Sequence, residues 1–92
     1  MKPEIFQTLF KSKVLKVERI ISCGQATPKK KWLKSQRNEW VTLLSGKARL
    51  KFKTGRVLTL KAGGSVFIRS GRPHRVEWTK PYSKTVWLAV HF

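Results

Sequence analysis

The sequence predicts an all-β fold in which short antiparallel strands form a sandwich or a barrel. From residue 14 onward, apolar and polar residues alternate with a period of two, and β-branched residues are frequent. Turn residues (Gly, Pro and Ser) interrupt this pattern about every 8–12 positions, as in small β-sandwiches and barrels. The 92 residues suffice for one such domain, because single hydrophobic cores are usually built from about 50–200 residues.

Seven segments follow the strand pattern and lie between the turn signals. They are residues 14–22, 39–44, 47–53, 56–61, 65–69, 74–79 and 85–92. The alternation is cleanest at 47–53, where Ala48, Leu50 and Phe52 share the face expected to be buried.

The same rule orients the segment 74–79. It predicts that His74, Val76 and Trp78 point into the core, while Arg75, Glu77 and Thr79 point outward. Trp40 and Trp87 also lie in strand-like segments, so we expect both in the core.

The N-terminal segment 1–13 follows a different pattern. Ile5 with Leu9 and Phe6 with Phe10 are spaced at i, i+4, which predicts a short helical turn. We therefore expect an N-terminal segment over 1–13 and a single β-barrel domain over 14–92. No internal repeat or linker is present in the sequence.

The balance of charge is the most unusual property of the composition. Lys and Arg number 21 against four acids, all glutamates, which gives a formal net charge of +17. Apolar residues make up 40% of the chain, so a folded core is expected despite this charge. Such a strongly basic domain favours nucleic acids or other polyanions as partners.

The single cysteine, Cys23, rules out an internal disulfide and is expected to be structural. The N-terminus has no continuous apolar stretch like that of a signal peptide, and no segment has the roughly 18 apolar residues of a membrane helix. These observations predict a soluble, cytoplasmic protein without a membrane partner.

Two motifs carry a resemblance to a known family. Gly63, Gly71 and His74 match the pattern G-x5-P-x-G-x2-H-x3-N, and Glu39 with Gly46 matches E-x6-G. Over residues 14–92 the chain resembles the small single-domain bacterial cupins. The resemblance implies a double-Greek-key β-barrel, also called a jelly roll. It also implies a homodimer, for which exposed strand edges supply a means of pairing.

The resemblance further implies that Glu39 and His74 are metal-ligand positions that face each other inside the barrel. The two histidines that usually precede the glutamate are missing, because their places hold either Trp32 and Lys34 or Leu33 and Ser35. The expected cofactor is therefore none or a weakly held divalent metal. Glu39 and His74 could instead form a hydrogen-bonded pair or an acid–base dyad. His91 is expected to follow Trp87 and Ala89 without acting as a third ligand.

Eight basic residues are candidates for binding a polyanion. They are Lys29, Lys30, Lys31, Lys34, Lys47, Arg49, Lys51 and Lys53. Trp32 lies among the first group and could stack on a base or line the pocket. Related small cupins tend to be acidic in the segment 29–38, so the chain is either a naturally basic cupin or a supercharged variant of a cupin scaffold.

Two classes of function remain open from the sequence. The first is a small-molecule pocket inside the barrel, in an enzyme or in a binding protein. The second is a non-enzymatic module or scaffold whose basic exterior binds nucleic acid without sequence preference, since no base-reading motif is present.

Overall fold

The computed structural model describes residues 2–92 as eight antiparallel strands in two sheets. The strands are β1 (Ile5–Lys11), β2 (Lys16–Ser22), β3 (Glu39–Ser45), β4 (Lys47–Phe52), β5 (Val57–Lys61), β6 (Ser65–Ile68), β7 (His74–Thr79) and β8 (Thr85–His91). One sheet has the order β1-β2-β8-β3-β6 and the other the order β5-β4-β7. The described residues form no helix, so none of them provides a helix that could cross a membrane.

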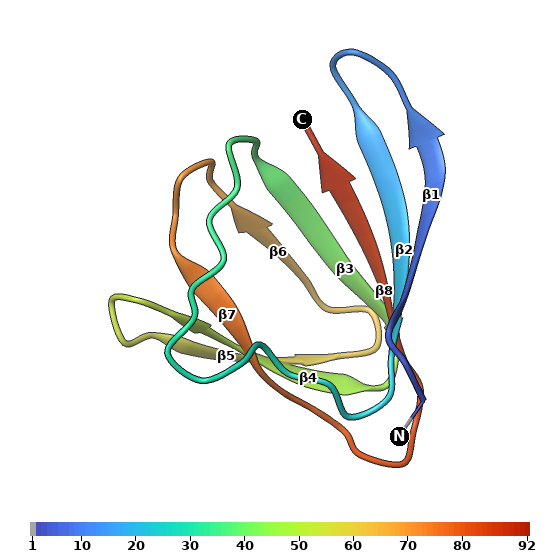
Figure 1. The fold of residues 1–92 in the computed structure, drawn as a ribbon, viewed down its shortest axis with the longest axis vertical. Coiled ribbons are helices and arrows are strands. Elements are labelled where there is room, and N and C mark those ends of the chain that lie inside the picture. The colour runs from blue at the N-terminus through green and yellow to red at the C-terminus, as the bar shows by residue number, and fades with distance from the viewer. Residues whose placement is uncertain (1) are drawn as a thin grey trace.

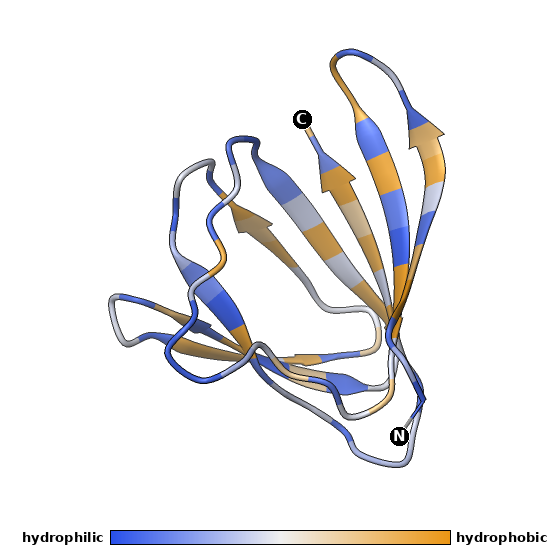
Figure 2. Ribbon diagram, viewed as in Figure 1, coloured by the Kyte–Doolittle hydropathy of each residue, from blue (hydrophilic) through white to orange (hydrophobic). Residues whose placement is uncertain are grey.

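The two sheets face each other and diverge toward one end of the molecule (Figure 1). Each of the seven segments predicted from the alternating pattern contains one strand, and the all-β architecture is confirmed. Figure 2 shows this alternation along β3, where orange residues alternate with pale ones after a blue first residue.

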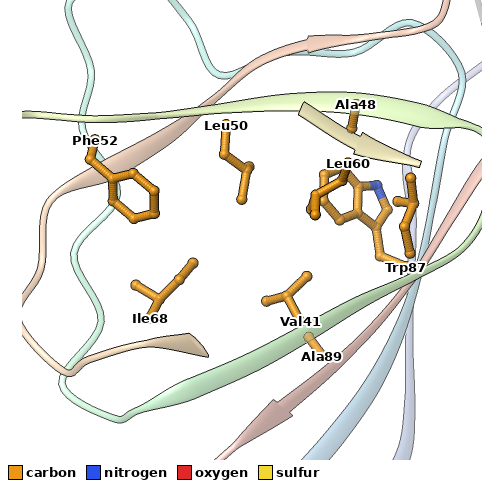
Figure 3. Packing of buried hydrophobic residues seen from close by; sticks show 9 residues of the cluster. Val41, Ala48, Leu50, Phe52, Leu60, Ile68, Trp87 and Ala89 are labelled. Carbon is orange, nitrogen blue, oxygen red and sulfur yellow. The ribbon is translucent and has the colours of Figure 1, made fainter. Parts of the chain in front are cut away.

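The core lies between the two sheets. Leu50 and Phe52 of β4 point toward Val41, Ile68 and Ala89 of the facing sheet (Figure 3). Trp87 is 4% exposed and packs in the same cluster as expected. Burial of this cluster is the main stabilising term, at roughly 25 cal/mol for each Å² of apolar surface removed from water.

The helical turn expected near the N-terminus is wrong. Residues Ile5–Lys11 form β1, which pairs with β2 alone and whose residues are all exposed. An isolated helix of this length is marginal in water, whereas the strand gains the ladder with β2. Ser12 closes the hairpin, because its hydroxyl accepts the Leu15 amide hydrogen bond at 3.1 Å.

The orientation predicted for the end of β7 is also wrong. A β-bulge in the β4–β7 ladder pairs Arg49 with Trp78 and Leu50 with Val76, so that Glu77 is an extra residue. The bulge reverses the alternation after Val76. Trp78 therefore lies on the outer face under the Arg49 guanidinium, whose Cζ is 5.3 Å from the ring centroid.

Two further side chains differ from the expected pattern. Thr79 faces inward, is 1% exposed, and donates a hydrogen bond to the Gln25 carbonyl at 2.6 Å. Trp40 is 47% exposed on the outer face of β3, where its indole nitrogen donates to the Thr42 hydroxyl at 3.1 Å. The alternating pattern of β3 places Val41 and Leu43 inward and leaves Trp40 outside.

Gly46 makes the corner at which the chain leaves the five-stranded sheet and enters the other. Its φ is +89°, and a Cβ there would lie 2.5 Å from the Thr85 hydroxyl and 2.7 Å from the Thr85 Cα. The corner therefore requires glycine both for its backbone conformation and for its close contact with β8.

We predict that Gly46→Ala lowers the free energy of unfolding by about 3 kcal/mol or more, because left-handed strain and overpacking add. Gly55→Ala is the matched control, since Gly55 has φ +102° but a Cβ added there would meet no other atom within 4 Å. The control should lose only the strain term of about 1–2 kcal/mol. Urea denaturation of both variants measures the difference, and equal losses would contradict the proposed contact with β8.

Candidate functional site

A cavity of about 470 Å³ lies between the two sheets. Side chains from both sheets form its walls, and most of them are apolar. They include Ile20, Val41, Leu50, Ile68, Val76, Trp87 and Ala89. A cavity of this size and lining suits a small organic molecule.

Glu39 and His74 meet in this cavity. Glu39 begins β3 and His74 begins β7, so each side chain comes from a different sheet. The His74 Nε2 lies 3.8 Å from Glu39 Oε2, and the two side chains are 6% and 15% exposed. The structure thus brings together the two residues that the motifs pointed to.

The backbone fixes the hydrogen-bonding state of His74. Its Nδ1 lies 2.9 Å from the Arg72 carbonyl oxygen, and a carbonyl oxygen can only accept. Nδ1 therefore carries the proton, and in the neutral ring Nε2 presents a lone pair toward Glu39 and the cavity. In that neutral state two acceptors face one another, and a group with two N–H or O–H hydrogens placed between them can donate to both.

His91 extends the cluster. The sequence placed it in phase with Trp87 and Ala89 but did not predict its contact with Glu39. Its Nδ1 lies 3.7 Å from Glu39 Oε1, and its Nε2 lies 3.4 Å from Glu18 Oε1. The buried Nε2 makes no hydrogen bond within the described part of the chain. The register pairs Glu39 of β3 directly with His91 of β8. The alternating pattern places His91 on the same inward face as Trp87 and Ala89. Its position next to Glu39 depends on the pairing of β3 with β8.

The loop between β2 and β3 closes one side of the cavity. Leu33 exchanges two backbone hydrogen bonds with His74, at 2.6 and 3.0 Å, and the Thr27 amide donates to the Val76 carbonyl at 2.9 Å. This pairing along β7 brings Leu33, Lys34 and Ser35 into the cavity lining. These are three of the four places where the missing histidines were sought.

The metal that the cupin resemblance implies does not fit this set of side chains. Glu39 contacts the two imidazoles through opposite oxygens, so its carboxylate separates the rings. Within residues 2–92, no group of three or more His, Cys, Asp or Glu side chains has the arrangement of a metal site. Lys34 lines the same cavity, and an ammonium group there repels a cation.

The candidate polyanion-binding residues are distributed over two regions. Lys47 and Arg49 are exposed on β4, Lys51 is half-buried beside them, and Lys53 follows the end of the strand. Lys29, Lys30 and Lys31 are exposed in the loop that runs beside β7. Lys34 belongs to the interior cavity, apart from the other candidates.

Comparisons with known proteins agree with the architecture. The family model described as "Cupin domain" matches residues 23–91. No curated protein matches significantly. Among solved structures, a putative mannose-6-phosphate isomerase from Ralstonia eutropha JMP134 is 41% identical with a TM-score of 0.94, over 99% of this chain and 85% of that one.

Two more distant structures share the fold alone. A cupin superfamily protein from Desulfitobacterium hafniense DCB-2 has a TM-score of 0.84 at 12% identity, over 98% of this chain and 77% of that one. The cupin domain of Schizosaccharomyces pombe Cnp3 has a TM-score of 0.82 at 14% identity, over 96% of this chain and 59% of that one.

We predict that His74→Ala lowers the free energy of unfolding by about 1–3 kcal/mol, because the Arg72 carbonyl loses its buried hydrogen-bond donor. His74→Asn is the control, since its amide can still donate toward the Arg72 carbonyl and should show a smaller loss. Chemical denaturation measures both variants, and a loss below about 0.5 kcal/mol for alanine would contradict the structural role of the imidazole.

The wild type and His74→Ala also test the metal-free interpretation. We expect zinc or nickel to change the melting temperature of both proteins equally. A metal raises the melting temperature only if it binds the folded state, and if His74 is not a metal ligand its removal does not change that binding. A gain in the wild type that disappears in His74→Ala would show that His74 is a metal ligand.

Proposed function

Since this chain belongs to the cupin family, we propose that its barrel interior is a binding pocket for a small organic molecule with an apolar body and a head group that donates hydrogen bonds. The observation that carries the proposal is the meeting of Glu39, His74 and His91 in a cavity whose lining is mostly apolar. Polar groups placed in this way fix the orientation of a ligand whose body fills the apolar space.

The chemistry of the head group follows from the acceptors that face the cavity. Glu39 has two carboxylate oxygens, and His74 presents the lone pair of Nε2 because Nδ1 donates to a carbonyl. An amine can donate to both, whereas a hydroxyl has one hydrogen and donates to one of them at a time. A carboxylate or a phosphate in the same position would place negative charge against Glu39, and juxtaposed like charges cost several kcal/mol.

A proton-transfer enzyme is the second candidate function. His91 lies between the carboxylates of Glu18 and Glu39, and Glu39 in turn contacts His74, so acids and imidazoles alternate across the cavity. Groups of this kind can accept a proton from a bound hydroxyl and return it. The name of the similar Ralstonia protein makes mannose 6-phosphate one substrate to test.

The apolar outer face of the five-stranded sheet supports the proposal that the protein is a homodimer. The register aligns one residue from each strand in a single row across the sheet. The row consists of Phe10, Val17, Val90, Trp40 and Phe67. Arg19 is the one charged residue that the aligned strands place on this face. Two copies of this chain, each of charge +17, can therefore meet there with little repulsion between like charges.

We predict that three molecules with one body and different heads bind in a defined order. 4-Phenylbutanol and 4-phenylbutylamine should bind at least about tenfold more tightly than 4-phenylbutyrate, although the net charge of +17 attracts the anion. Calorimetric titration of the full chain measures the three affinities. Glu39→Gln should remove the discrimination, and Thr42→Gln, on the outer face of the same strand, should preserve it.

The opposite results would contradict the pocket proposal. Tighter binding of the carboxylate in the wild type would show that surface charge controls binding. Binding of mannose 6-phosphate, without binding of any of the three phenylbutyl compounds, would show that the cavity selects a polar anion. That result would favour the activity named for the similar Ralstonia protein.

We predict that light scattering in about 0.5 M salt, which screens surface charge, gives twice the monomer mass for the wild type. Trp40→Arg should yield a monomer, because it places a charge in the centre of the apolar row. Trp78→Arg is the matched control on the other sheet and should remain dimeric. A monomeric wild type at high concentration would contradict the proposed dimer.

A further inference from the structure

A second hollow, separate from the barrel interior, lies on the outside of the three-stranded sheet. It is a groove of about 630 Å³ beside the Trp78 ring. Lys47, Lys61 and Lys80 line it together with Trp78, and no residue lines both this groove and the interior cavity. The groove is therefore independent of the site described above.

The strand register explains how three ammonium groups gather there. Lys47 of β4 lies directly opposite Lys61 of β5. The Lys80 amide, just after β7, donates to the Lys47 carbonyl at 3.1 Å. The β-bulge at Glu77 turns Trp78 to the outer face, opposite Arg49, and so places an indole ring among these cations.

The positive charge of the groove is not compensated by nearby acids. Glu4 and Glu39 line the interior cavity, and Glu18 contacts His91. Glu77, the remaining acid, pairs with the Arg75 Nε at 3.1 Å. Within residues 2–92, no carboxylate forms an ion pair with Lys47, Lys61 or Lys80. An anion is thus the missing partner of the groove.

The indole ring narrows the class of anion. An aromatic ring among lysines provides a stacking surface for a base and charges for phosphates, which is how proteins bind single strands without sequence preference. The bases of a duplex are stacked on each other and cannot lie on Trp78. Arg49 and Lys51 continue the charge along β4, with a spacing of about 6.8 Å between alternate residues.

We propose that this groove binds single-stranded nucleic acid. A base displaces the Arg49 guanidinium from the face of Trp78 and stacks on the ring, and successive phosphates contact Lys47, Lys61 and Lys80. The extension of the basic strip beyond the groove favours an oligonucleotide over a mononucleotide. The proposal does not depend on what the interior cavity binds.

The test uses the full chain and three fluorescent probes in anisotropy titrations: a 12-nucleotide oligothymidylate, a duplex of the same length, and polyglutamate. We expect the single strand to bind most tightly. Trp78→Ala should weaken that binding about 5–100-fold, as for the loss of one stacked base. Val14→Ala shortens an exposed apolar side chain of the β1–β2 hairpin, which lines neither hollow, and should leave the affinity unchanged.

A charge-matched pair of triple variants tests the lysines. Changing Lys47, Lys61 and Lys80 to Gln should reduce the log–log salt slope for the single strand by about 2, at about 0.7 for each lost phosphate contact. Changing Lys2, Lys11 and Lys13 to Gln removes the same charge near the N-terminus and should change the slope much less.

Three results would overturn the proposal: equal binding of duplex and single strand, equal binding of polyglutamate, or an affinity that Trp78→Ala leaves unchanged. If Trp78→Ala does not fold, Trp78→Leu retains the apolar bulk without the indole stacking surface. Quenching of tryptophan fluorescence by the single strand should then be present in the wild type and smaller in Trp78→Leu, and identical quenching would also overturn the proposal.

Discussion

The carboxylate of Glu39 is the group on which the arrangement of the open end of the barrel depends. It is largely buried between two sheets, and a buried charge without partners costs several kcal/mol. His74 from the opposite sheet and His91 from the neighbouring strand lie on its two sides. The His74 ring is held in turn by a backbone carbonyl. The polar cluster therefore consists of side chains from β3, β7 and β8, and its geometry follows from the packing of the two sheets.

Charge is segregated between the inside and the outside of the molecule. Three of the four glutamates lie at the interior cavity or in contact with its histidines, whereas most of the 21 cationic residues have no acid beside them. Two kinds of ligand therefore suit two separate surfaces. The interior favours donors of hydrogen bonds, and the groove at Trp78 favours phosphates. A chain with this distribution can hold both functions on one fold, because neither site shares a residue with the other.

Much of the fold could be predicted because its signals are local. Alternation over a few residues identified seven strands, and spacing within two motifs identified Glu39 and His74. The features that escaped prediction depend on pairing between distant segments. Ile5 and Phe6 fit a helical spacing equally well until β2 is available as a partner. The bulge that turns Trp78 to the outer face is a property of the β4–β7 register.

The role of His91 shows the same limit. Its inward phase was evident in the sequence, but its contact with Glu39 requires the antiparallel pairing of β3 with β8. The motif pointed to a metal, whereas the side chains that surround Glu39 in three dimensions led us to propose an organic ligand. A pattern can thus identify the residues of a site, whereas the chemistry of the site depends on neighbours that the pattern does not include.

A crystal structure of the protein with 4-phenylbutanol at saturating concentration is the most direct test of whether the interior cavity binds an apolar molecule through a hydrogen-bond donor. We expect the phenyl ring against the apolar wall at Trp87, with the hydroxyl oxygen within hydrogen-bonding distance of Glu39 or of His74 Nε2. A cavity without the alcohol, an alcohol whose hydroxyl points toward Lys34, or a metal ion held jointly by Glu39 and His74 would contradict it.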